Sequence, residues 1–196
     1  MAYGEPAGAG RARSASYSAA QTRVIEAALV LFAEHGVGGT SLQMMADAIG
    51  VTKAAVYHQF NTKEEIVLAV AEGVLARLEE AVEAAEAEKS RSRAREVLIR
   101  GMIDLAVERR HVASILLRDP VMVRVLEEHE PSRQMRERLY RVLMGNQVGT
   151  KAKVEAATLS AAIGGAVIHP LVRELDDDTL RSQLLQLVRR FLHRPE

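Results

Sequence analysis

Two short apolar-periodic stretches separated by a single glycine constrain the fold of this chain most strongly. They lie within "ADAIGVTKAAVYHQF", residues 46–60. Gly50 supplies a positive φ at low cost, and Thr52 is a good helix cap directly after it. Ala46 is small enough for a following helix to cross close to it. The pattern predicts two short helices on a tight turn, which is either an ordinary helical hairpin or a helix-turn-helix.

The rest of the chain beyond residue 18 is also predicted to be helical. Aromatic residues make up only 4% of the sequence, and no stretch shows sustained period-two alternation. Apolar residues recur with helical spacing from residue 20 to residue 34. We therefore predict an all-α protein of about nine helices. Its expected parts are a flexible arm (1–18), a three-helix head (19–65) and a larger helical body (66–196).

Composition excludes several classes of protein. The hydrophobic fraction of 48% and the charged fraction of 27% are typical of a folded chain, and the formal net charge is zero. The absence of cysteine excludes disulfides, thiolate metal sites and a cysteine nucleophile. No apolar run approaches the roughly 20 residues that span a bilayer. We expect a soluble, cytoplasmic protein that does not contact a membrane.

Motifs of enzymes are missing from the sequence. It has no glycine-rich phosphate loop, no Gly-x-Ser-x-Gly elbow and no His-Glu-x-x-His site. His111 and His129 lie on separate predicted elements without a second histidine one helical turn away. We therefore expect no enzymatic activity, no cofactor and no metal.

The outer face of the helix that follows Gly50 distinguishes a helix-turn-helix from a plain hairpin. Thr52 and Lys53 begin this helix, where free N–H groups and the helix dipole favour phosphate. Ala54 and Ala55 are small enough to let a helix enter the major groove and contact thymine methyl groups. This face predicts binding to DNA.

Further donors follow on the same helix and on the next one. Tyr57 and His58 can donate to phosphate oxygens, and Lys63 begins the next helix. No arginine occurs from position 24 to position 76. The sequence therefore argues against base recognition by arginine and leaves Lys53 as the cationic candidate in the recognition helix.

The segment "TSLQMMADAIGVTKAAVYHQFNTKEEIVLAVAE", residues 40–72, resembles the N-terminal domain of the TetR family of bacterial transcriptional regulators. The resemblance rests on a threonine after glycines, Ile-Gly-Val at the turn, Val-Tyr-x-x-Phe at the helix end and Lys-Glu at the start of the next helix. It implies a head that binds DNA and a variable helical body. The residues it places at or near DNA are Thr40, Thr52, Lys53, Ala54, Ala55, Tyr57, His58 and Lys63, with Gln43 as a weaker candidate.

Two segments near the C-terminus suggest a dimer. The predicted helix over 151–169 is rich in small residues, and the last helix has a broad apolar stripe. Together they suggest a self-complementary four-helix interface; packing within the same chain is the alternative. The predicted interface residues are Ala157, Ser160, Ala161, Ala162, Gly164, Gly165, Leu180, Leu184, Val188 and Phe191.

The resemblance also implies a pocket in the body for a small apolar or amphipathic ligand. Each candidate residue has a simpler alternative as plain core or surface, since methionines also fill gaps in cores. The candidates are Met102, Leu105, Arg109, His111, Leu116, Met122, Leu126, Met135, Leu139, Tyr140, Leu143 and His169.

The favoured hypothesis is a homodimeric repressor that a small molecule releases from a pseudo-palindromic operator. Two alternatives keep the same fold. One is a DNA-binding protein with an architectural or non-transcriptional role, and the other is a regulator without a small-molecule inducer.

Overall fold

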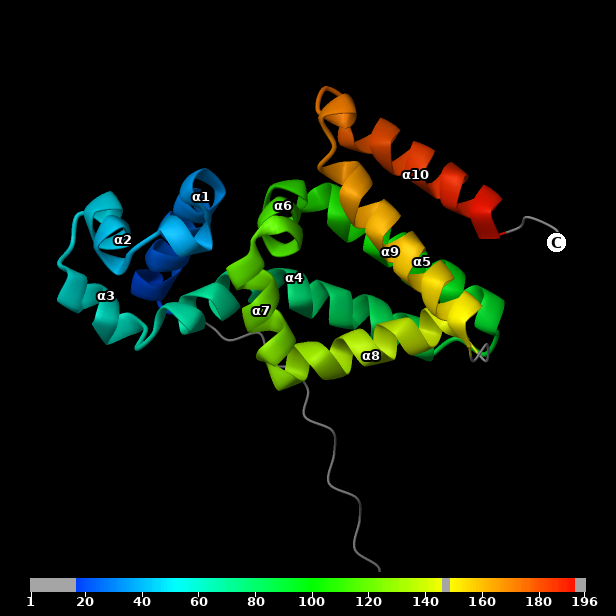
Figure 1. Ribbon diagram of the computed structural model, residues 1–196, viewed down its shortest axis with the longest axis horizontal. Coiled ribbons are helices and arrows are strands. Elements are labelled where there is room, and N and C mark those ends of the chain that lie inside the picture. The colour runs from blue at the N-terminus through cyan, green and yellow to red at the C-terminus, as the bar shows by residue number, and fades with distance from the viewer. Residues whose placement is uncertain (1–16, 146–148, 193–196) are drawn as a thin grey trace, which may run out of the picture.

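The computed structural model describes residues 17–145 and 149–192, with side chains placed through Arg190, and these residues form an all-helical protein (Figure 1). The predicted fold class is confirmed, although the described ranges hold ten α-helices rather than about nine. The helices are α1 (Ala19–Gly39), α2 (Leu42–Ile49), α3 (Lys53–Gln59), α4 (Lys63–Glu86), α5 (Arg91–Glu108), α6 (Arg110–Arg118), α7 (Pro120–Glu128), α8 (Glu130–Met144), α9 (Thr150–Val167) and α10 (Asp177–Leu192), with a 3₁₀ helix, η1, at Pro170–Val172.

The first three helices form the head at one end of the molecule (Figure 1). Met45 and Ala46 of α2 and Val56 of α3 are fully buried against α1. Gly50 adopts the left-handed conformation predicted for the turn, with φ 70° and ψ 38°. Phe60, which ends α3, is also buried. The burial of Val56 and Phe60 fixes which face of α3 points outward.

Helix α1 extends beyond the predicted stretch of residues 20–34. Gly36 breaks it with φ 71° and ψ 163°, and a further helical turn follows as far as Gly39. Thr40 is buried, and its hydroxyl donates to the carbonyl oxygens of Leu31 and Gly36 at 3.1 and 2.8 Å. Ser41 caps α2 by accepting from the Met44 N–H.

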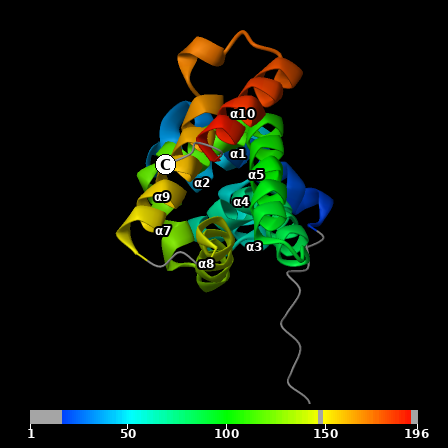
Figure 2. The same ribbon diagram turned by 90° about the vertical axis from the view of Figure 1, so that its right-hand side faces the viewer.

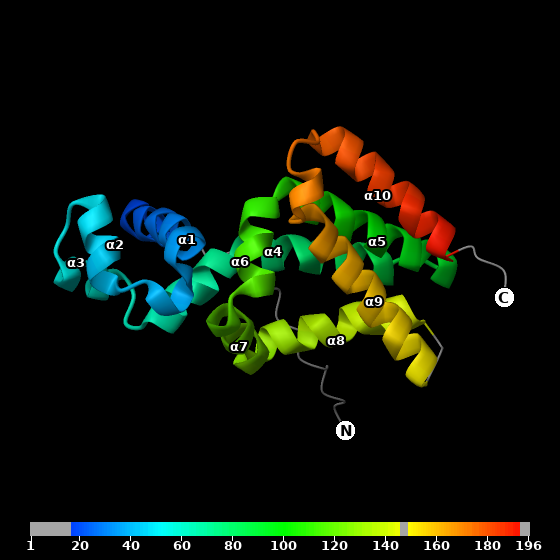
Figure 3. The same ribbon diagram turned by 45° about the horizontal axis from the view of Figure 1, so that its top comes forward.

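Helix α4 runs from the head through the body and pairs most closely with α5 (Figure 3). Gly101 makes this approach close, because a Cβ atom at that position would lie 2.7 Å from the Cβ of Ala81. The body core then extends through α8, α9 and α10. On α8, Arg138 binds Glu79 and Glu86 of α4 at 3.3 and 2.7 Å, and its guanidinium holds the pKa of Glu86 below the usual range.

The head and the body share one hydrophobic core. Ile115 of α6, with Met122 and Val125 of α7, packs in the same cluster as Phe32 and Val37 of α1. Burial of these side chains away from water is the main attraction between the two parts. The head is therefore packed on the body as well as joined to it through α4.

A single carboxylate reinforces this junction. Asp119, between α6 and α7, accepts a hydrogen bond from the Val37 N–H at 2.7 Å through Oδ2. Its Oδ1 accepts from Val121 and Met122, which caps α7. The break at Gly36 brings the chain so close to this carboxylate that a Cβ there would lie 3.1 Å from Oδ2. One side chain thus satisfies amides of both the head and the body.

The close approach at Gly101 predicts opposite effects for two glycine substitutions. We expect Gly101→Ala to lower the free energy of unfolding by about 1 kcal/mol, because the clash with Ala81 outweighs the gain in helix propensity. Gly73→Ala, on an exposed face of α4 with nothing within 4 Å, should raise it by up to about 1 kcal/mol. Urea denaturation measures both. If Gly101→Ala and Gly73→Ala raised the free energy of unfolding equally, the close approach of α4 and α5 at Gly101 would be contradicted.

The two roles of Asp119 can be separated by substitution. Asp119→Ala should lower the free energy of unfolding by about 2 kcal/mol, because it removes the α7 cap and leaves the Val37 amide without its acceptor. Asp119→Ser retains a cap but is too short to reach Val37, so its stability should lie between wild type and Asp119→Ala. Urea denaturation measures the stability of both variants. If Asp119→Ser is as stable as wild type, the hydrogen bond to the Val37 amide contributes nothing to the free energy of unfolding.

Candidate nucleic-acid interface and ligand cavities

The outer face of α3 presents an exposed, mixed surface. With Val56 and Phe60 turned inward, the opposite side of the helix is open to solvent. Its exposed residues are those that the sequence placed at DNA: Thr52, Lys53, Ala54, Ala55, Tyr57 and His58. The structure therefore brings these candidates together on one surface, and contact with DNA remains a prediction.

Two of these side chains lie against each other. The Lys53 Nζ atom is 5.7 Å from the centroid of the Tyr57 ring, and Tyr57 is 46% exposed. This arrangement places a cation and a phenol hydroxyl on the same side of α3, where both can bind phosphate oxygens. The Thr52 hydroxyl is already used as the cap of α3, since it accepts from the Ala55 N–H at 3.2 Å. Lys63, half-buried at the start of α4, completes the predicted set.

Two predicted contacts have a different role within the head. Thr40 is only 2% exposed and its hydroxyl is hydrogen-bonded to two carbonyl groups, so its side chain does not reach the surface. We correct that prediction: Thr40 stabilises the chain between α1 and α2. The amide of Gln43 is exposed but donates to Asp47 at 2.7 Å, and it would have to leave this partner to meet DNA.

The residues that hold α3 in place were missed by the sequence analysis. Ser18 and Gln21 form a reciprocal capping box at the start of α1, and Gln21 also donates to the carbonyl of Gln59 at 3.4 Å. Arg23 donates to the carbonyl of Ile49, beside the turn, at 2.8 Å. The Ser-x-x-Gln pattern at residues 18–21 was a visible signal for the cap. Nothing in the sequence indicated the contact with Gln59.

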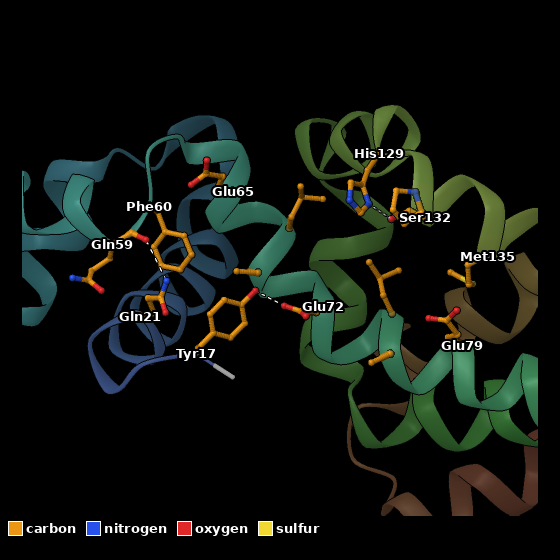
Figure 4. Close-up of a pocket in the computed structure, with 15 residues that line it drawn as sticks. Tyr17, Gln21, Gln59, Phe60, Glu65, Glu72, Glu79, His129, Ser132 and Met135 are labelled. Atoms are coloured by element: carbon orange, nitrogen blue, oxygen red, sulfur yellow. Dashed lines mark hydrogen bonds between the residues drawn. The ribbon is translucent and has the colours of Figure 1, made fainter. Parts of the chain in front are cut away.

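A first cavity, the junction groove, lies between the head and the body (Figure 4). It has a volume of about 490 Å³. The Tyr17 hydroxyl donates to Glu72 across it, and burial raises the pKa of the Tyr17 phenol, as does that hydrogen bond. Its lining residues are Tyr17, Gln21, Gln59, Phe60, Glu65, Leu68, Ala69, Glu72, Leu75, Ala76, Glu79, His129, Pro131, Ser132 and Met135.

A second cavity, the body cavity, has a volume of about 350 Å³ and is surrounded by α4 to α9. It contains many of the residues predicted to bind a ligand: Met102, Leu105, Arg109, Leu116, Leu126, Met135, Leu139 and Tyr140. The other lining residues are Val74, Leu75, Leu78, Ala106, Ala113, Leu117, Val123, Ser132, Arg136, Ser160, Ile163 and Gly164. The two cavities share Leu75, Ser132 and Met135 as a common wall.

The remaining ligand candidates lie outside the body cavity. Met122 is fully buried in the core shared by head and body, and Leu143 is fully buried in the body core. His111 and His169 are exposed, and the His169 ring accepts from the Leu171 N–H at 3.2 Å. We correct these four predictions, because helical periodicity marks an inward face without distinguishing a packed core from a cavity wall.

The predicted dimer surface is only partly exposed. The exposed side of α9 carries Ala157, Ala161, Ala162 and Gly165. Figure 2 shows that α9 and α10 lie on the side of the body away from the head. A Cβ at Gly165 would meet no atom within 4 Å. Small residues on this face therefore leave space that nothing in the described chain fills.

Other predicted interface residues are used within the chain. The body core buries Leu180, Leu184 and Val188 of α10. For these three residues the structure therefore supports packing within the same chain, which was the alternative to a dimer interface. Ser160 and Gly164 line the body cavity instead. The side chain of Phe191 lies outside the described residues, as does most of the predicted arm. On α10, Leu187 is 59% exposed and remains available to a partner.

The helices that carry the candidate interface match a known family. The sequence profile described as "Bacterial regulatory proteins, tetR family" matches residues 24–70, which run from α1 into α4. Residues 24–70 thus match the N-terminal segment of the TetR family. The match contains the turn at Gly50 and all of α3, so the surface described above corresponds to the part that the family shares.

One relative that this chain resembles is the transcriptional repressor AcnR of Corynebacterium efficiens. The two are 37% identical over 59 residues, which is 30% of this chain and 31% of AcnR. The alignment thus spans less than a third of the relative.

Solved structures show the same fold over nearly the whole chain. A TetR-family regulatory protein from Rhodococcus RHA1 has a TM-score of 0.69 at 16% identity, covering 91% of this chain and all of that one. AibR, solved in complex with isovaleryl coenzyme A and operator DNA, has a TM-score of 0.63 at 18% identity, covering 86% and 97%. In the part of this chain that the structure describes, no helix is long and apolar enough to cross a membrane.

Proposed function

We propose that this chain is a homodimeric transcriptional repressor of the TetR family in the cytoplasm, where it binds a specific operator through α3. The observation that carries the proposal is the exposed face of α3, on which Lys53 and Tyr57 meet while Val56 and Phe60 anchor the helix from behind. A rigidly held helix with small central residues can enter the major groove, where base pairs are distinguishable. The repressor relative and the structural neighbour with operator DNA support this proposal.

Recognition by this helix would depend on few long side chains. Lys53 is its only cation, and Ala54 and Ala55 offer methyl groups to thymine. Lys53, Tyr57, His58 and the neighbouring Lys63 would bind phosphates and so fix the register of the head on DNA.

The dimer is proposed to form through the open face of α9 and the outer face of α10. Small residues on α9 allow two helices to approach closely, and Leu187 adds apolar surface on α10. A two-fold dimer presents two α3 helices to successive major grooves, which requires a pseudo-palindromic operator.

A ligand in the body cavity would release the operator by moving the head, and two sets of helices connect the cavity to the head. The first is α4, which lines the cavity with Val74 and Leu78 and runs directly into the head. The second is α6 and α7: Ile115 is buried in the shared core, and Leu116 both packs against that core and lines the cavity. A ligand that shifts α6 or α7 would therefore shift α1 as well.

The alternative of an architectural DNA-binding protein differs in specificity. It would bind many sequences with similar affinity, whereas a regulator prefers its operator by orders of magnitude at fixed salt. Selection of bound sequences from random DNA by the purified protein distinguishes the two. Recovery of a palindrome supports the regulator, and recovery of no consensus supports the architectural role.

Lys53→Ala and Tyr57→Phe should each weaken binding to the selected operator while leaving the dimer intact. We expect a loss of about tenfold for each variant, because each removes a phosphate contact, and Lys53→Ala should also reduce the salt dependence by about one counterion. Fluorescence anisotropy over a range of salt concentrations measures both effects. The control is Lys89→Ala, an exposed lysine beyond the far end of α4. Unchanged affinity in both α3 variants would exclude this helix from the groove.

A charge on the open face of α9 should separate the subunits. Ala161→Glu adds a carboxylate where the proposal places the partner, so light scattering should give the mass of one chain, 21.5 kDa, in place of twice that value. Ala84→Glu, on an exposed face of α4, is the matched control and should remain dimeric. A dimeric Ala161→Glu variant would move the interface elsewhere.

A further inference from the structure

The body cavity carries charge of one sign. Arg109 and Arg136 line it, and none of its described lining residues is acidic. The junction groove, on the other side of the shared wall, shows the opposite pattern: Glu65, Glu72 and Glu79 recur about two turns apart along α4. The two adjacent cavities thus differ in the charged side chains that line them, with arginines in the body cavity and glutamates in the junction groove.

The guanidinium groups of Arg109 and Arg136 form no hydrogen bond or ion pair with the residues that the structure describes. Nearby arginines in the sequence do form ion pairs: Arg110 binds Asp177 at 2.7 Å, and Arg138 binds Glu79 and Glu86. A guanidinium presents five N–H donors in a planar fork that matches carboxylate or phosphate. An anion could bind Arg109 and Arg136 without displacing an existing ion pair.

The arginines stand at the edge of an otherwise apolar space. Arg109 is exposed and Arg136 is half-buried, whereas Leu105 and Leu139, which line the same cavity, are buried. Tyr140, Ser132 and Ser160 add neutral polar groups. Apolar walls with a few polar groups are typical of small-molecule sites, and the polar groups orient the ligand. Here they would hold the head group of a ligand near the solvent and direct its apolar part inward.

We propose that the body cavity binds a small anionic amphiphile, with an apolar body between the helices and a carboxylate or phosphate head bound by Arg109 and Arg136. This inference names the ligand class of the proposed function and rests on it for its regulatory meaning. Binding itself requires no operator, so it can be measured on the purified protein without DNA. Failure of the ligand prediction is therefore distinguishable from failure of DNA binding.

The test compares ten-carbon probes that differ only in the head group. Isothermal titration calorimetry of the full chain with decanoate, decyl phosphate, 1-decanol and decylamine should give binding of at least one anion about tenfold or more tighter than decanol, and no binding of decylamine. The relative affinities of decanoate and decyl phosphate then identify the head group. Decylamine or decanol binding as tightly as both anions would overturn the proposal, as would the absence of binding by either anion.

Substitution of the arginines locates the anion. Arg109→Gln and Arg136→Gln should each weaken binding of the preferred anion about tenfold, with decanol affinity unchanged. Arg136→Lys, which keeps the charge, should restore part of the loss. Arg100→Gln, an exposed arginine of α5 outside the cavity, is the matched control. Circular dichroism melts confirm that each variant is folded, and unchanged anion affinity in both glutamine variants would overturn the assignment.

Discussion

The packing of the head against α6 and α7 is the constraint on which the rest of the structure depends. Buried apolar side chains provide most of the attraction, and the Asp119 carboxylate makes it directional because it bonds to the Val37 amide. This bond requires the chain to turn at Gly36, where a positive φ releases that amide from the helix. The orientation of α3 is thus fixed relative to the body as well as within the head.

The sequence predicted the parts of this molecule that depend on local physics. Gly50 and the Thr52 cap specify the turn of the head because backbone conformation and capping act over a few residues. The outward face of α3 was predicted from the residue types that follow Gly50, which are Thr52, Lys53, Ala54 and Ala55. Thr40 was misplaced because its burial depends on carbonyl groups at the end of α1, and no spacing within the recognition segment reveals them.

Contacts between distant helices could not be predicted in the same way. The stripe of Leu180, Leu184 and Val188 was correctly seen as apolar, but whether it packs on the same chain or on another depends on where α5 lies. Met122 and Leu126 show the same limit, since both are apolar positions of α7 and only the second lines a cavity. The sequence identifies inward faces, while tertiary packing decides which of them surround empty space.

The wall between the two cavities has a mechanical consequence. Met135 belongs to both linings, and a methionine side chain has three rotatable bonds and adapts to irregular gaps. A rotation of this side chain toward one cavity would reduce the volume of that cavity and enlarge the other. A molecule that displaced Met135 from the body cavity would therefore reduce the space in the junction groove.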